Sequence, residues 1–102
     1  MSEFFNRIYE IVKQVPYGKV ITYGTVARLA GSPRASRQVG WALHNNPQPG
    51  VIPCHRVVFK DGSLTSGFAF GGMEIQKGML LSEGVSFSEE FKVDMAKCLW
   101  EV

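Results

Sequence analysis

Two short helical patterns joined by a two-residue break constrain the fold of this chain more than any other feature. A threonine suited to cap a helix precedes residues 23–30, and Gly31 is suited to end that helix because glycine readily adopts the left-handed backbone. Ser32 is suited to cap a second helix over residues 33–44, with Pro33 at the first helical position, where its missing N–H costs nothing. Helices joined so closely are typical of a helix-turn-helix unit.

Glycine and proline divide the rest of the chain into short segments. Four of these segments have readable patterns: a helix over residues 3–14, a strand over 56–59, a Gly-rich loop over 62–72 and a helix over 73–83. Residues 85–102 fit either a strand with a turn or a short helix. A chain of 102 residues has room for one domain, so residues 1–102 are expected to form a single, mostly α unit with a short β element.

Basic residues are concentrated in the first part of the chain, although the formal net charge is only +2. Between Ile11 and Lys60 there are seven Lys and Arg residues and no acid. A polyphosphate-binding face requires such a segment of one sign, and the alternative is a chance excess of basic residues. No apolar run approaches the roughly 20 residues that cross a bilayer, and the first residues lack a signal-peptide pattern. A cytoplasmic protein without a membrane partner is therefore expected.

The second helix of the pair, PRASRQVGWALH, combines arginines with small residues. Val39 and Leu43 fall near one face and are expected to pack on the first helix. The residues left for the other faces are Arg34, Ser36, Arg37, Gly40 and Trp41. Small residues beside an arginine let a helix backbone approach a groove of DNA closely. The alternative is a solvated helix with two arginines, and Trp41 fits a core position and a groove-lining position equally well.

Cys54 is a candidate nucleophile because it lies next to His55 in a cationic segment, which favours the thiolate. A lone cysteine is more often a small buried apolar residue, as is expected for Cys98. Adjacent residues of a strand point to opposite faces, so the pair works together only if Pro53 imposes a turn or a water bridges the two side chains. The cysteines and histidines do not have the spacing of a zinc site, so no metal is expected.

The segments IPCHRVV, residues 52–58, and KVITYGTVARLAGSPRASRQVG, residues 19–40, together with Glu83-Gly84, resemble the C-terminal domain of the O6-alkylguanine-DNA alkyltransferases and the alkyltransferase-like proteins. The resemblance implies a winged helix-turn-helix-like domain that acts as a monomer on double-stranded DNA containing O6-alkylguanine. It also implies docking in the minor groove and rotation of the damaged base out of the helix. No cofactor is implied, because the thiol itself would take the alkyl group.

The resemblance assigns chemical roles to four residues. Cys54 corresponds to the alkyl acceptor, and His55 to the residue that takes the thiol proton through a water. Glu83 corresponds to the acid that orients this histidine, and Asn46 to the asparagine that ties the active-site turn together.

The resemblance also assigns roles on DNA. Tyr23 corresponds to the tyrosine that pushes the nucleotide phosphate and helps rotate the base, and Arg37 to the arginine that fills the gap in the stack. The full set expected to contact DNA is Tyr23, Arg34, Ser36, Arg37 and Gly40. The set expected to line the lesion pocket is Tyr23, Val57, Phe68 and Phe70, although packing of their own loop fits the two phenylalanines equally well.

The sequence departs from the repair enzymes at the lid of the pocket. Their Tyr-Ser-Gly-Gly lid is replaced by residues 69–72, Ala-Phe-Gly-Gly, and a lysine of the following helix by Gln76. These features resemble the alkyltransferase-like proteins, which bind the lesion without repairing it and usually lack the cysteine. Three functions stay open: an enzyme that alkylates itself at Cys54, a damage sensor that recruits nucleotide excision repair proteins, and a helix-turn-helix transcription factor of unrelated descent. The transcription factor would have no need for a Cys-His-Arg segment.

Overall fold

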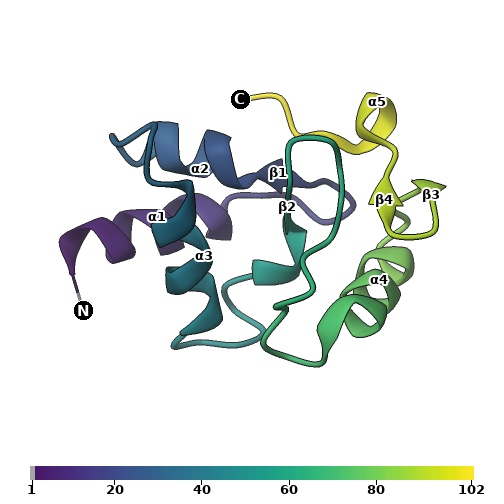
Figure 1. Ribbon diagram of the computed structural model, residues 1–102, viewed down its shortest axis with the longest axis horizontal. Helices are drawn as coiled ribbons and strands as arrows, with labels where there is room; N and C mark the ends of the chain where they lie inside the picture. Colours follow the sequence, from purple (N-terminus) through teal and green to yellow (C-terminus); the bar gives the residue numbers. More distant parts are fainter. Residues whose placement is uncertain (1) are drawn as a thin grey trace.

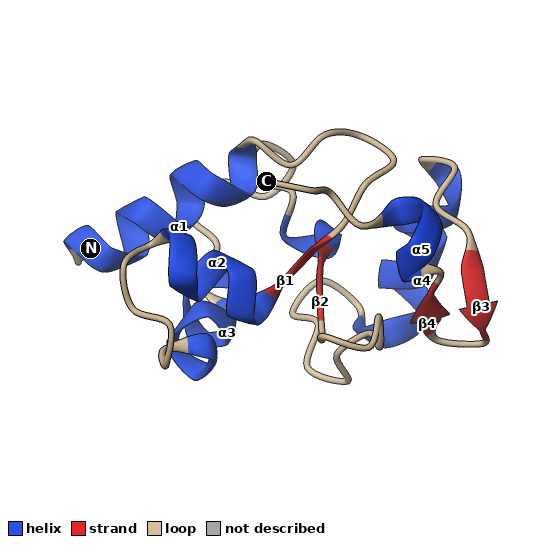
Figure 2. Cartoon of the chain, turned by 90° about the horizontal axis from the view of Figure 1, so that it is seen from above, coloured by secondary structure: helices blue, strands red, loops and turns tan. Residues whose placement is uncertain are grey.

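The computed structural model describes residues 2–102, and it is mostly helical with two small sheets, as expected (Figures 1 and 2). Its elements are α1 (Glu3–Lys13), β1 (Ile21–Thr22), α2 (Tyr23–Leu29), α3 (Ser36–His44), a 3-10 turn η1 (Cys54–Arg56), β2 (Val57–Val58), α4 (Gly72–Ser82), β3 (Phe87–Glu89), β4 (Lys92–Val93) and α5 (Met95–Cys98). Strands β1 and β2 pair in parallel, and β3 pairs antiparallel with β4. Within the described part of the chain, no helix combines the length and the apolar character needed to cross a membrane.

Helices α1, α2 and α3 form one half of the molecule, and α4, α5 and the β3–β4 hairpin form the other (Figures 1 and 2). The first half has its own core because each helix turns an apolar face inward, with Val12 of α1, Val26 of α2 and Val39 of α3 fully buried. Burying each such side chain contributes about 1.5–3 kcal/mol relative to leaving it in water. The hydroxyl of Tyr9 donates a hydrogen bond to the Ala42 carbonyl at 2.8 Å and so links α1 to α3.

The β1–β2 ladder lies between the two halves and belongs to both cores. Ile21 pairs with Val57, and both pack in the core of the three helices. Val58, the next residue of β2, packs in the second core with Leu80 of α4. Because successive side chains of a strand point to opposite faces, two residues of β2 are enough to join the two cores. The segment that holds Cys54 leads directly into this ladder.

Helix α2 begins where the sequence predicts, because the Thr22 side chain accepts a hydrogen bond from the Thr25 N–H at 3.2 Å. Gly31, with φ at +94°, follows the helix end as expected. The predicted start of the next helix is wrong, because α3 begins at Ser36 and not at residue 33. Ser32 and the residues after it form a turn closed by an Ala35 N–H to Ser32 carbonyl bond of 3.0 Å. The proline starts a turn here and not a helix.

The strand expected over residues 56–59 is shorter and begins later. Residues 54–56 form the 3-10 turn η1, with the Arg56 N–H donating to the Pro53 carbonyl at 2.9 Å, and only residues 57–58 are extended. The turn after Pro53 is the geometry that the Cys-His pair needs. Residues 85–102, for which two patterns were open, contain both a hairpin and a short helix.

Candidate functional site

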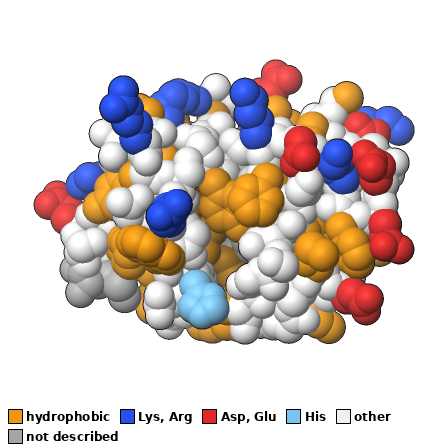
Figure 3. Space-filling model, in the orientation of Figure 1, with side chains coloured by type: hydrophobic (Ala, Val, Ile, Leu, Met, Phe, Trp, Pro, Cys, Tyr) orange, Lys and Arg blue, Asp and Glu red, His pale blue; other side chains and the backbone are white. Residues whose placement is uncertain are grey.

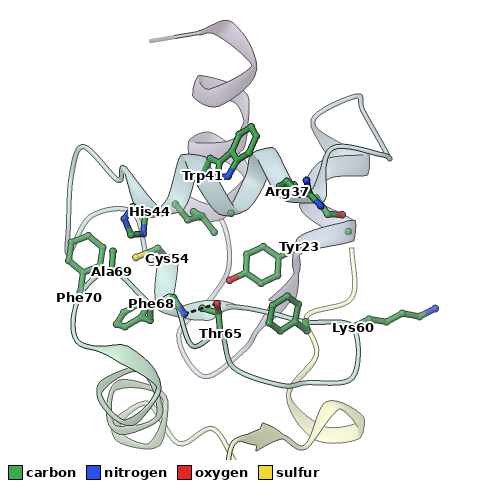
Figure 4. Close-up of a pocket in the computed structure, with 16 residues that line it drawn as sticks. Tyr23, Arg37, Trp41, His44, Cys54, Lys60, Thr65, Phe68, Ala69 and Phe70 are labelled. Atoms are coloured by element: carbon green, nitrogen blue, oxygen red, sulfur yellow. Dashed lines mark hydrogen bonds between the residues drawn. The ribbon is translucent and has the colours of Figure 1, made fainter.

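Helix α3 has two distinct faces. The inward face buries Val39, Ala42 and Leu43 against the other helices. The outward side carries residues that line a cavity of about 680 Å³, namely Ser36, Arg37, Gly40, Trp41 and His44 (Figure 4). Gly40 has open space where a side chain would stand, so the backbone of the helix is exposed at that point.

The other walls of the cavity come from three separate segments (Figure 4). Tyr23 lies at the start of α2, Cys54 lies in η1, and Thr65, Phe68 and Phe70 lie in the loop before α4. Burial raises the pKa of Tyr23 to about 12, against the effect of its hydrogen bond with Thr65. The phenol therefore stays neutral and can lie beside a phosphate without charge repulsion.

Basic groups line the cavity without acidic ones. Arg37 and Lys60 are the charged lining residues in the described part of the chain, with His44 beside them. On the face seen in Figure 3, most of the acidic side chains gather over the half that holds α4 and the β3–β4 hairpin. A concave surface with cationic groups and no carboxylate favours a polyanionic ligand.

Cys54 is half-buried and follows a turn held by Asn46. The Asn46 amide donates to the Ile52 carbonyl at 2.9 Å, and its oxygen accepts from the Gln48 N–H at 2.8 Å. Burial raises the pKa of the Cys54 thiol, and hydrogen bonding by Asn46 offsets only part of this effect. The resting thiol is therefore mainly protonated at neutral pH, and a transfer reaction would need a base.

His55 is buried, and a charged network holds its ring. Its Nε2 lies 2.7 Å from Oε2 of Glu83, and the Arg56 guanidinium donates to both oxygens of the same carboxylate at 2.8 Å. Burial acts to raise the pKa of Glu83, but the hydrogen bonds from Arg56 and His55 outweigh it and lower the pKa to about 2. The anionic Glu83 favours the His55 tautomer with a proton on Nε2, which leaves Nδ1 as an acceptor.

Gln76 and Arg56 belong to the site, although the sequence assigned them no role. The fully buried Gln76 amide donates to the His55 carbonyl at 3.1 Å and to the Val57 carbonyl at 3.3 Å, and so ties η1 to α4. Arg56 donates to the Val15 carbonyl at 2.8 Å as well as to Glu83. Polar residues also lie near Gln76 in α4, so no local sequence pattern marked Gln76 as buried.

The structure brings most of the expected residues to one cavity. Tyr23, Ser36, Arg37, Gly40, Cys54, Phe68 and Phe70 all line it, while His55, Glu83 and Asn46 lie in the network and the turn around Cys54. Two expected residues lie outside the cavity. Arg34, expected to contact DNA, is exposed in the turn before α3 but lies outside the cavity, so its contact with DNA stays a prediction. Val57 is fully buried in the helical core, because its side of β2 faces α1–α3.

The cavity wall also includes residues to which the sequence assigned no role, namely Gly24, Phe59, Lys60, Thr65 and Gly67. His44, expected to be a surface residue near the helix end, is exposed at the end of α3 and lines the cavity as well. Trp41, for which two positions were open, is 55% exposed and lines the cavity, so it is not a core residue. Cys98 is buried, as expected, and its sulfur lies 3.4 Å from the Ser86 N–H.

Replacing Asn46 by alanine is expected to lower the free energy of unfolding by about 2 kcal/mol, because the Ile52 carbonyl and the Gln48 N–H each lose a partner. Urea denaturation followed by circular dichroism measures this loss. The matched control is Asn45→Ala, since Asn45 is exposed and donates only to the Trp41 carbonyl at 2.9 Å. Equal losses in the two variants would contradict the role of Asn46 in holding the turn.

Comparison with known protein families matches residues 3–85 to the DNA-binding domain of 6-O-methylguanine DNA methyltransferase. The chain belongs to this family, and descent from an unrelated helix-turn-helix factor is thereby excluded. It is 41% identical over 99 residues to the DNA base-flipping protein of Escherichia coli strain K12, covering 97% of this chain and 75% of that protein.

Two matches to fission yeast proteins, one in sequence and one in structure, extend over nearly the whole chain. Alkyltransferase-like protein 1 of Schizosaccharomyces pombe is 38% identical over 106 residues, covering 99% of this chain and 97% of the relative. The crystal structure of S. pombe Atl1 in complex with damaged DNA containing O6-carboxymethylguanine superimposes with a TM-score of 0.86 and 34% identity, covering 100% of this chain and 98% of that one.

Proposed function

We propose that this protein binds double-stranded DNA that contains an O6-alkylated guanine and holds the damaged nucleotide, rotated out of the helix, in the cavity beside Cys54. One observation carries the proposal: Arg37, Tyr23 and Cys54 line a single cavity although they lie on three different elements. A nucleotide in that cavity would lie between the residue that fills the stack and the sulfur. The names and ligands of the relatives, a base-flipping protein and Atl1 with damaged DNA, agree with this arrangement.

The proposed binding mode places the outward face of α3 against the minor groove. Gly40 lets the helix backbone approach closely, and Arg37 enters the space that the departing base leaves. Tyr23, which is neutral, lies at the start of α2 where it can press on the phosphate of that nucleotide. Extrusion costs a few kcal/mol, and less when alkylation has already weakened the base pair, which gives the protein its preference for damage.

We further propose that Cys54 accepts the alkyl group. The sulfur would form a bond to the alkyl carbon while the bond from that carbon to O6 breaks. The thiol proton would pass to His55 and from there, through water, to the ring of the leaving guanine. The support is the intact set of Cys54, Asn46 and the Glu83-bound His55. The reaction would consume the thiol, so each molecule acts once.

The second candidate is a damage sensor that holds the nucleotide without reacting and recruits excision repair proteins. Two observations favour it. Burial raises the pKa of Cys54, so the resting sulfur is a weak nucleophile. The chain also aligns along nearly its whole length with an alkyltransferase-like protein.

Mass spectrometry distinguishes the two candidates. Incubation with an excess of a duplex containing O6-methylguanine is expected to add one methyl group per protein molecule, in the peptide that carries Cys54. Cys54→Ser is the control, and it is expected to bind the duplex without gaining mass. An unchanged mass of the wild-type protein at saturated binding would contradict alkyl transfer to Cys54. The damage sensor would then be the remaining candidate.

A further inference from the structure

Trp41 is a large aromatic side chain with no partner in the described structure. It lies on the outward face of α3, one turn after Arg37 and one turn before His44, and 55% of it is exposed. Within residues 2–102, the indole makes no ring contact, cation–π contact or side-chain hydrogen bond. Trp100, by contrast, is half-buried and packs against the core of the three helices. Trp41 therefore contributes little to folding.

Three of the four exposed aromatic side chains among the described residues lie at the cavity, and the fourth, Tyr17, contacts Arg56 instead. Among the described residues, the exposed Trp and Phe side chains are Trp41, Phe59 and Phe70, and all three line the cavity. Such a cluster marks a binding surface, because isolated apolar residues are common on surfaces but clusters of aromatic ones are not. A flat π-face stacks on any nucleic acid base, whatever the sequence.

The charge around Trp41 indicates what covers it. The charged lining residues are Arg37 and Lys60, without an acidic neighbour among the residues described, so the ligand is expected to be anionic. Gly40, beside Trp41, has open space where a side chain would stand, so no side chain at that position covers the indole, which projects from α3 (Figure 4). A ligand that combines a negative backbone with flat aromatic rings is a nucleic acid strand.

We propose that Trp41 is a binding residue for the extruded nucleotide, whose sugar or base packs on the indole while Arg37 occupies the stack. This inference rests on the proposed function. Trp41 lines the cavity that also contains Cys54, so a nucleotide that enters this cavity covers the indole. Trp41 therefore stabilises the complex with damaged DNA and adds little to binding of an intact duplex.

Trp41→Ala is expected to weaken binding to a duplex with O6-methylguanine about tenfold, within the range for loss of one base–aromatic contact, and to leave binding to the undamaged duplex within about twofold. Trp41→Phe keeps a smaller ring and is expected to recover part of the loss. Fluorescence anisotropy gives both dissociation constants. Leu29→Ala is the matched control, because Leu29 is 41% exposed and apolar but does not line the cavity.

A spectroscopic readout tests the same contact in a protein that keeps Trp41. The chain has two tryptophans, so Trp100→Phe leaves Trp41 as the only one. Its fluorescence is expected to be quenched by the damaged duplex and much less by the undamaged one at equal saturation. Thermal melting confirms that each variant is folded.

The outcomes separate this inference from the proposed function. Equal losses of affinity on both duplexes in Trp41→Ala would overturn the inference, because Trp41 would then be an ordinary groove contact. Unchanged affinity on both would overturn it as well. If the wild-type protein does not prefer the damaged duplex, the proposed function itself fails and the inference fails with it.

Discussion

Arg37→Ala is expected to bind a duplex containing O6-methylguanine roughly 30- to 150-fold more weakly than the wild-type protein, a loss of about 2–3 kcal/mol. The reason is that the arginine offsets part of the cost of unstacking the base, and alanine is too short to fill the gap. Tyr23→Ala is expected to weaken binding in the same direction. Fluorescence anisotropy at a fixed salt concentration measures these losses, since contacts to phosphates depend strongly on salt.

Arg34→Ala is the control for Arg37→Ala. Both residues are exposed arginines near the start of α3, but only Arg37 lines the cavity. Arg34→Ala is expected to weaken binding to the damaged and the undamaged duplex alike. The affinity of this variant is expected to depend slightly less on salt. Wild-type affinity in Arg37→Ala would contradict the proposed binding mode, whereas equal losses in the two variants would reduce Arg37 to a phosphate contact.

Glu83→Ala is expected to destabilise the protein by about 3–5 kcal/mol, because it leaves the nearly buried Arg56 guanidinium without its carboxylate. A loss of that size is a large part of the stability of a small domain, which is typically about 5–15 kcal/mol. Urea denaturation followed by circular dichroism measures it. Glu90→Ala is the control, since Glu90 is exposed in the β3–β4 hairpin, and its effect is expected to stay within about 0.5 kcal/mol.

The same pair predicts how stability depends on pH. In the folded protein the pKa of Glu83 is about 2, whereas an unfolded glutamate has a pKa of about 4.3. Because the folded pKa is the lower one, the stabilisation is complete above the unfolded pKa and is lost as the pH falls towards 2. Glu83→Gln is therefore expected to lose less stability than the wild-type protein across this range. Parallel profiles for the two proteins would contradict the assignment.

The sequence predicted the parts of the fold that depend on local chemistry. Capping by Thr22 and the left-handed Gly31 fixed the limits of α2, and both are confirmed. The predicted start of α3 was wrong because the residues before Ser36 form a separate turn. This turn is closed by a backbone hydrogen bond from the Ala35 N–H to the Ser32 carbonyl. Proline is compatible with both structures, so the sequence pattern does not distinguish them.

The parts of the site that depend on tertiary packing were not predictable in the same way. Cys54 and His55 were readable from a short motif, but the place of Val57 depends on which core its side of β2 faces. Gln76 binds two carbonyls of a segment 19 and 21 residues earlier, a contact that no local pattern reports. His44 and Trp41 became cavity residues only because the loop of residues 65–70 lies opposite α3.

The Arg56–Glu83 pair has a consequence for how such a chain can change its activity. Arg56 joins Glu83, at the end of α4, to the Val15 carbonyl that follows α1, so the pair holds the two halves of the protein together while it also orients His55. A variant that no longer reacted with its ligand would still need both residues to remain folded. Cys54 does not hold the two halves together in this way. A chemically active protein and an inert one can therefore share the same fold and the same Arg56–Glu83 pair, and differ by one side chain at position 54.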